Sequence, residues 1–475
     1  MNNHYEEDTQ NVKSTHDCAP RVRTDVGNRR HALGLETLDT VSPVAALSYA
    51  GRILLRNSLP ILSLLALGTG TSMARGQDAP KKEDTPAAAA KPAQPAPAAQ
   101  PAPAAPAGPA PGAVTITGLL DGYFQVNYQH PGTAGKPTFA APFSGVNATR
   151  AFDYKDGFGL SLGEINISRT AGKGFPLGVT ATLTAFDTPP VVYATEPGAK
   201  AGYEGIQQLY LTYTPHAFGR DIAIDFGKFV TPLGYEVIES VNNDNYSRGL
   251  LFTYGIPFYH TGFRFTAPLT KKLNFVGGIV NGWNNTADDN DAKSFFTQFS
   301  WTPDSHFNGI LNFMGGPEGT GAYGKIVPTA GGGFITTNLV EFIPVYNVNS
   351  KLKLAGDLLY ANGAGNVRGT HVSGNWFGMA AYARYQWTPQ FATAIRAEQF
   401  EDMPGVGAIP GNAAGGLRFG AGYAKVRSFT VTLEYAAFHN KLISRLEYRH
   451  DRANQNFGPI GPDQDTLTLG EAYKF

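Results

Sequence analysis

The chain has 475 residues, with 38 basic and 38 acidic side chains, so its balanced charge gives no indication of nucleic-acid binding. Only 16% of the residues are charged, while 56 are Gly, 22 Tyr and 30 Phe. No run of 18 apolar residues follows the N-terminal region, which excludes membrane-spanning helices, and the enrichment in Gly and aromatic residues is typical of many strands and turns. The single cysteine, Cys18, excludes a disulfide framework and a cysteine-based metal site.

Residues 52–76, RILLRNSLPILSLLALGTGTSMARG, have the pattern of a secretory signal peptide. Arg52 and Arg56 precede a short apolar stretch at 60–68, and small residues follow it. We therefore expect residues 1–76 to be an N-terminal extension and signal peptide whose removal also removes Cys18. An over-extended start and a long leader both account for the 51 residues that come before it.

Residues 79–113 consist almost entirely of Pro and Ala. Proline lacks the backbone donor and favours extended polyproline geometry, which predicts a disordered, semi-rigid spacer. We place this periplasmic linker at residues 77–113, and recognition by a proline-binding domain is the weaker alternative.

From residue 114 the sequence alternates between apolar and polar side chains. In residues 114–128, Ile116 and Phe124 fall on one face, and Thr117 and Asp121 fall on the other. Segments of about ten alternating residues suit a tilted strand that crosses a membrane. The alternation returns at 175–185, 221–227, 428–438 and 442–451.

Short and long connections alternate along this region, as they do in outer-membrane barrels with short periplasmic turns and long outside loops. A first count gives 17 strands, but treating residues 418–438 as one strand gives sixteen and places both ends of the barrel in the periplasm. Residues 114–475 are thus predicted to form an all-β, antiparallel, up-and-down transmembrane barrel of about 16 strands. The short connections are expected at 169–174, 215–220, 268–271, 302–305, 348–350, 388–390 and 439–441, and the long ones at 129–156, 188–202, 230–261, 284–293, 316–332, 362–374, 403–417 and 452–463.

The last ten residues, TLTLGEAYKF, alternate like a strand that belongs in a sheet. Leu469, Tyr473 and Phe475 share one face, and Glu471 is the exception on that face. We expect this strand to close the barrel against the first one, with its aromatic side chains at the inner membrane interface.

Three stretches resemble known outer-membrane proteins. Tyr473 and Phe475 look like the terminal signal that the barrel assembly machinery recognises. Residues 227–264, GKFVTPLGYEVIESVNNDNYSRGLLFTYGIPFYHTGFR, together with RLEYRHD at 445–451, resemble the OmpL-like putative beta-barrel porin family. This resemblance covers roughly residues 114–475 and implies a porin-like channel in the outer membrane of a Gram-negative bacterium, without identifying its solute.

Charged side chains on the polar face of a barrel strand are expected to point into the lumen. The pattern R-x-E-x-x-x-D occurs twice, beginning at Arg396 and at Arg445. Such charges can set a field that orients dipolar solutes, or they can form a paired ladder that only braces the wall. The expected pore-lining residues are Arg264, Arg384, Arg396, Glu398, Glu434, Arg445, Glu447, Arg449 and Asp451.

The connection at 230–261 contains many large apolar side chains for a loop in water. By analogy with sixteen-stranded porins, whose third loop folds into the barrel, Glu236, Glu239, Asp244 and Arg248 are candidates for the constriction. Packing over the rim or a contact within a trimer would explain the same composition equally well.

We therefore predict a porin that allows passive diffusion of small hydrophilic solutes or ions and is not an enzyme. A lipid-modifying barrel hydrolase and a cell-wall tethering barrel are the alternatives. Ser247 and His260 could be assigned to a hydrolase, but they lack the spacing of a triad. The ten His residues show no ligand spacing, so we expect no metal or cofactor.

Residues 77–475 carry 30 basic and 31 acidic side chains, so any ion preference must come from where charges lie in the pore. The expected partners are outer-membrane lipids, the barrel assembly machinery, the cell wall through the Pro/Ala linker, and two further copies in a homotrimer, but no nucleic acid.

Overall fold

The structure is a computed structural model of the chain. It describes residues 112–129, 149–171, 174–193, 196, 204–288, 290–318, 335–367, 370–402, 424–454 and 461–475. The expected signal peptide at 1–76 and almost all of the expected linker at 77–113 lie outside these residues, so both stay predictions.

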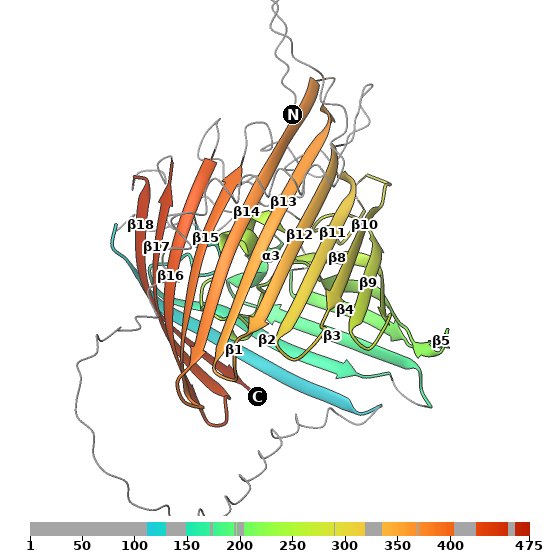
Figure 1. Cartoon of the computed structure of the whole chain (residues 1–475), viewed down its shortest axis with the longest axis horizontal. Coiled ribbons are helices and arrows are strands. Elements are labelled where there is room, and N and C mark those ends of the chain that lie inside the picture. Colours follow the sequence, from blue (N-terminus) through green and yellow to red (C-terminus); the bar gives the residue numbers. More distant parts are fainter. Residues whose placement is uncertain are drawn as a thin grey trace, which may run out of the picture. The chain divides into compact units, whose positions relative to one another are not determined.

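Sixteen of the described strands close into one antiparallel barrel (Figure 1). Each wall strand pairs with the wall strands that come before and after it in the sequence, and β1 pairs with β18 to complete the ring. This confirms the predicted up-and-down barrel and its strand number. The wall strands are β1 (Val114–Asn127), β2 (Gly157–Arg169), β3 (Leu177–Ala185), β4 (Ile206–Tyr213), β7 (Ala223–Val230), β8 (Tyr259–Pro268), β9 (Leu273–Val280), β10 (Ser294–Trp301), β11 (Phe307–Glu318), β12 (Ile335–Asn347), β13 (Leu352–Val367), β14 (Thr370–Gln386), β15 (Phe391–Asp402), β16 (Ala424–Ala437), β17 (Leu442–Ala453) and β18 (Asp463–Lys474).

The remaining described elements are short and lie in the connections. The turn expected at 215–220 holds a two-stranded hairpin of β5 (His216–Ala217) and β6 (Arg220–Asp221). Helix α3 (Thr188–Val192) follows β3, and the connection between β7 and β8 contains the 3-10 turn η1 (Ser240–Asn242) and the π-helical turn η2 (Leu251–Gly255). No described helix has the length and apolar character needed to cross a membrane.

Four of the short turns have the same pattern of side-chain to backbone hydrogen bonds. In each of them a side-chain oxygen accepts hydrogen bonds from the backbone N–H groups two and three residues later, which is the known preference of Asp, Asn and Thr in turns. The acceptors are Thr270, Asp304, Asn349 and Thr388. At Asp304, the N–H groups of His306 and Phe307 hold the pKa of the carboxyl below its usual value.

Two expected boundaries differ from the structure. Residues 362–374, predicted as an outside loop, are largely strand, because β13 continues to Val367 and β14 begins at Thr370. The alternation in this stretch is weak because Gly and Asn are frequent, which is why the sequence suggested a loop. The strand expected at 418–438 is β16, whose described part is Ala424–Ala437, and residues 403–423 lie outside the described part of the chain.

The alternation of side chains sorts the wall into a lipid face and an inner face. On β1, Ile116 and Phe124 are exposed on the outside of the barrel, whereas Asp121 and Gln125 are buried inside it. Glu471, the exception on the apolar face of β18, accepts a hydrogen bond from Ser444 Oγ at 2.7 Å, and Ser444 is its cross-strand neighbour. On β1 the outer face is therefore apolar, and the polar side chains lie inside the barrel.

Phe475 completes the closure at the end of β18. Its backbone makes two hydrogen bonds with Gly118 on β1, of 3.0 and 3.1 Å, and its ring stacks on that of Tyr473. The ring lies directly over Gly118, where a Cβ atom would meet it at 2.1 Å. The first and last strands are thus joined by backbone bonds and by aromatic packing.

Candidate functional site

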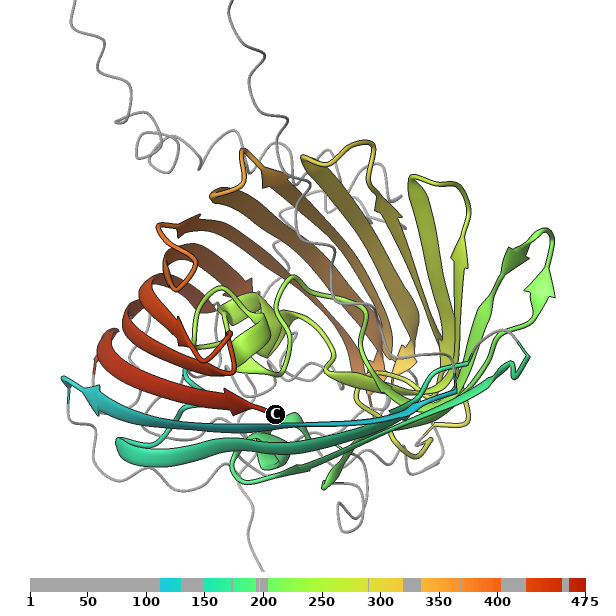
Figure 2. The same ribbon diagram turned by 90° about the horizontal axis from the view of Figure 1, so that it is seen from below.

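The connection between β7 and β8, residues 231–258, enters the barrel and is called loop 3 below. Figure 2 shows it as the light green segment with a coiled turn inside the ring of strands. Its side chains Leu250, Tyr254, Ile256 and Phe258 are at most 1% exposed. The structure therefore places the apolar residues of this loop inside the wall rather than in water.

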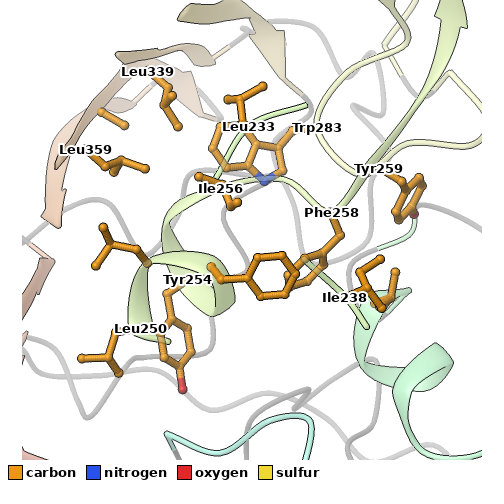
Figure 3. Packing of buried hydrophobic residues seen from close by; sticks show 14 of the residues in the cluster. Leu233, Ile238, Leu250, Tyr254, Ile256, Phe258, Tyr259, Trp283, Leu339 and Leu359 are labelled. Carbon is orange, nitrogen blue, oxygen red and sulfur yellow. The ribbon is translucent and has the colours of Figure 1, made fainter. Parts of the chain in front are cut away.

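The apolar side of loop 3 packs against side chains that reach inward from several strands. Figure 3 shows Ile256, Tyr254 and Leu250 of the loop together with Leu339 of β12 and Leu359 of β13. The indole of Trp376 donates a hydrogen bond of 3.0 Å to the carbonyl oxygen of Gly255. These contacts hold η2 against the wall formed by β12 to β14.

The opposite side of the loop is held by three arginines of the wall. Arg396 donates to the carbonyl oxygen of Ser247 at 2.6 Å, and Arg449 donates to that of Arg248 at 2.8 Å. Arg445 donates to the carbonyl oxygens of Ser240, Asn243 and Asn245 at 2.5, 2.8 and 3.2 Å. These guanidinium groups bond to carbonyl oxygens of loop 3 that lie outside any strand. One guanidinium can bind several of them because it has five N–H donors.

Carboxylates of the same wall accept from loop N–H groups. Glu447 accepts from the N–H groups of Tyr246 at 2.6 Å and Ser247 at 3.1 Å, and Glu398 accepts from that of Leu250 at 2.6 Å. On β1, Asp121 accepts from the hydroxyl of Tyr246 at 2.9 Å. Burial raises the pKa of the Tyr246 hydroxyl well above its usual value, so that hydroxyl stays protonated and continues to donate.

The wall charges neutralise each other as they bind the loop. Arg396 lies 2.9 Å from Glu398 and 2.7 Å from Glu236 of the loop, and Arg449 lies 2.8 Å from Asp451. Burial raises the pKa of Glu236, and the adjacent guanidinium of Arg396 opposes that rise. A buried charge is tolerated only when it is paired and hydrogen-bonded, and this arrangement provides both.

The four candidate constriction residues occupy different surroundings. Glu236 and Arg248 are buried, and the guanidinium of Arg248 donates to the carbonyl oxygen of Ile238 at 2.9 Å. Glu239 is half-buried and accepts from the side-chain amide of Gln207 on β4 at 2.6 Å. Asp244 accepts from Lys353 at 2.8 Å and from the hydroxyl of Tyr235 at 2.7 Å.

The nine residues expected to line the pore divide into two groups. Arg264, Arg384 and Glu434 keep 17%, 20% and 9% of their side-chain surface exposed, with Arg264 paired to Asp225 at 2.7 Å and Arg384 paired to Glu434 at 2.6 Å. The other six side chains are at most 3% exposed, whereas we expected them to face open water. These six are Arg396, Glu398, Arg445, Glu447, Arg449 and Asp451.

These six side chains are buried because loop 3 covers them. The alternation within a strand identifies the inward face, but it contains no information about which polar side chains a loop will cover. Arg396, Arg445 and Arg449 donate hydrogen bonds to carbonyl oxygens of loop 3. Neutralising them would therefore weaken the attachment of this loop rather than change the charge on an open pore surface.

Other residues that take part in this arrangement were not identified from the sequence. Glu341 of β12 accepts from the N–H of Gly234 at 2.9 Å, and Asp357 of β13 lies beside the N–H of Tyr235 at 3.4 Å. Each is a single carboxylate in a largely apolar strand, at a position whose side chain points inward. That position in the alternation is the sequence feature from which they could have been identified. Arg150 lies in the connection after β1, where no periodicity exists, yet it is buried and donates to Thr468 at 3.0 Å.

Within the described ranges, no group of three or more His, Cys, Asp or Glu side chains is arranged to hold a metal ion. Ser247 and His260 are both buried and bind different partners: Arg396 donates to the hydroxyl of Ser247, while His260 contacts Thr231 and the carbonyl oxygen of Gly282. The geometry therefore joins neither residue into a nucleophile and base pair.

Comparisons with known proteins agree with this architecture. The family model described as putative beta-barrel porin-2, OmpL-like, matches residues 113–475. Among solved structures, the outer-membrane channel DcaP of Acinetobacter baumannii is similar, with 12% identity, a TM-score of 0.50, and coverage of 77% of this chain and 98% of that one. The anion-selective porin from Comamonas acidovorans is similar, with 11% identity, a TM-score of 0.50, and coverage of 77% and 100%. No curated protein sequence matches the chain.

Proposed function

This chain belongs to the OmpL-like putative beta-barrel porin family, and from that premise we propose that small hydrophilic solutes or ions cross its lumen where loop 3 leaves the wall uncovered. The protein is a passive channel of the outer membrane. The accessible inner charges are the part of the molecule that a passing solute would meet, and they therefore determine its ion preference.

The observation that supports this path is a polar pocket of about 280 Å³ between loop 3 and the wall. It is lined by charged side chains of both signs, and neutral amides of Asn243 and Gln386 lie beside them. Three of the charged side chains are basic and two are acidic, so the local balance is positive. The charged lining residues are Asp244, Arg384, Glu434, Arg445 and Lys474.

Lys353 adds a further positive charge beside this pocket. Its side chain is 34% exposed, and its ammonium nitrogen lies 2.8 Å from Asp244. Glu164 of β2 and Glu239 of loop 3 lie together on another part of the inner surface. Because the basic side chains outnumber the acidic ones at this pocket, whereas Glu164 and Glu239 lie elsewhere on the inner surface, we propose a transverse field with a mild preference for anions.

A reversal potential across a KCl gradient tests this assignment. Purified channels carrying Lys353→Gln and Arg384→Gln should become more cation-selective than the wild type, because two accessible positive charges are lost while Asp244 and Glu434 stay in place. Lys351→Gln is the control, since Lys351 is exposed in the turn before β13. An unchanged reversal potential in a conducting double variant would show that these side chains do not control selectivity.

We propose a channel without enzymatic activity, because Ser247 and His260 belong to separate buried networks. The tethering alternative rests on the Pro/Ala segment, almost all of which lies outside the described residues, and a cell-wall pull-down with and without residues 79–113 would test it. Homotrimer formation, recognition of Tyr473 and Phe475 by the barrel assembly machinery, and cell-wall contact are likewise proposals.

A further inference from the structure

The lipid-facing side of β15 to β18 changes from apolar to charged toward the outer ends of these strands. Val431 of β16 and Tyr448 of β17 are cross-strand neighbours in the apolar part of this face. The next outward row pairs Phe429 with His450, and the row beyond it pairs Arg427 with Arg452. The change therefore occurs over two rows, as expected where a barrel passes from hydrocarbon to the lipid headgroups.

Arg427 and Arg452 are directly opposite each other, and like charges at such positions are unfavourable on their own. The Nε atom of Arg427 donates to Gln399 at 2.9 Å, which is a neutral partner. The Nε atom of Arg452 lies 3.6 Å from Asp463, and the Arg452 side chain is 67% exposed. Among the described residues, the ion pairs on this face give a carboxylate to Arg452 but none to Arg427.

Lys425 and His450, the neighbouring basic side chains on this face, each contact a carboxylate. Lys425 lies 2.7 Å from Glu401, and His450 lies 2.8 Å from Asp465. Arg427 is thus the basic side chain of this face to which none of the described ion pairs gives a carboxylate, and both Arg427 and Arg452 are exposed.

We propose that Arg427 and Arg452 bind a phosphate group of an outer-leaflet lipid, with its acyl chains lying on the apolar rows below. A guanidinium presents paired donors that match phosphate oxygens, and two guanidiniums on adjacent strands can share one phosphate. An anion between them also removes the repulsion between the two arginines. Because both side chains point away from the lumen, a solute passing through the channel cannot supply the phosphate, whereas a lipid beside the barrel can.

The apolar rows below the arginines provide the second part of the site. Phe429 is 42% exposed and Tyr448 is 41% exposed on the same face, so both are available to acyl chains. A lipid bound here would contact the wall through its chains and its phosphate together, which distinguishes it from a free anion.

The test uses the full purified barrel in detergent and native mass spectrometry. The probe is a bacterial glycolipid that carries phosphate on its sugars, compared with the same lipid after dephosphorylation. Wild-type protein should retain the phosphorylated form preferentially, and the double variant Arg427→Gln, Arg452→Gln should bind it about tenfold more weakly, as the loss of charge-assisted hydrogen bonds predicts. The double variant Lys351→Gln, Lys441→Gln loses the same charge in periplasmic turns and should bind like the wild type.

Three results would overturn the proposal: unchanged binding in the arginine variant, equal retention of the dephosphorylated lipid, and displacement of the lipid by an equal concentration of inorganic phosphate. Migration of the unheated barrel on gels verifies that each variant is folded. If the double variant does not assemble, Arg427→Gln alone, which leaves the pair of Arg452 and Asp463 intact, must still reduce retention for the proposal to stand.

Discussion

Arg396 shows how a buried charge can hold a loop inside a barrel. Its guanidinium contacts a carboxylate of its own strand, a carboxylate of loop 3 and a carbonyl oxygen of that loop. Removing the charge would leave Glu398 and Glu236 buried without their common partner. Its contribution is therefore structural and local, and it differs from that of Arg384, which is half-buried beside the polar pocket.

Arg396→Gln should lower the free energy of unfolding of the barrel by roughly 3 kcal/mol, as expected when one partner of a buried ion pair is removed. Arg384→Gln should cost about 1 kcal/mol or less, because that pair is partly exposed and Glu434 keeps Arg445 at 2.7 Å. Guanidinium unfolding in detergent micelles, followed by tryptophan fluorescence, measures both changes. Equal destabilisation by the two variants would contradict the distinction drawn between them.

Loop 3 combines an apolar side and a polar side in one segment. Leu250 and Ile256 pack against the wall, while the backbone around Tyr246 and Ser247 is bound by charged wall residues. Backbone polar groups without strand partners must be satisfied inside a protein, and Glu447 does this for two consecutive N–H groups. The loop is thereby fixed in position by wall side chains at both of its surfaces.

Glu447→Gln should loosen this part of loop 3 without opening the barrel. The amide replaces one acceptor oxygen with a donor, so a loop N–H or the hydroxyl of Thr432 loses its partner, at a cost of about 1–3 kcal/mol. Hydrogen exchange read by mass spectrometry should show faster exchange in peptides that contain Tyr246 and Ser247. Glu471→Gln, the same chemical change on the outer face of β18, should leave these peptides unchanged, and similar exchange in both variants would count against the anchoring role.

The sequence predicted the wall better than it predicted the interior. Alternation alone indicated that Arg445, Glu447 and Arg449 share one face of β17, because the period of a strand is two and lipid requires apolar side chains on the other face. It could not predict that loop 3 would bury them, since that depends on contacts between residues about 200 positions apart, such as Arg445 with Asn243. Arg150 shows the same limit more clearly, because a connection has no periodicity from which its burial can be inferred.

The barrel as a whole depends on the joint between its first and last strands. This joint is the pairing of β1 with β18, which begins at Leu119 and Lys474 and continues to Asn127 and Thr466. Phe475 extends the joint by one residue through its two backbone bonds to Gly118. A closed barrel has no free strand edge, so a defect at this joint exposes backbone groups that lipid cannot satisfy.

Phe475→Asp should reduce the amount of assembled barrel in the outer membrane more than it alters the conductance of the barrels that do form. The substitution removes the ring that stacks on Tyr473 and covers Gly118, and it puts a charge on a side chain that is 55% exposed on the outer surface. A charge facing lipid costs from near zero close to the interface to a few kcal/mol at the centre, so the loss of ring packing and closure should dominate. Heat-modifiable migration of the membrane fraction measures assembly, and single-channel recording measures the permeation of the remaining barrels. Phe475→Leu, which keeps an apolar side chain, is the matched control and should assemble at an intermediate level. Normal amounts of heat-modifiable barrel with Asp at this position would show that the joint between β1 and β18 closes without the aromatic ring.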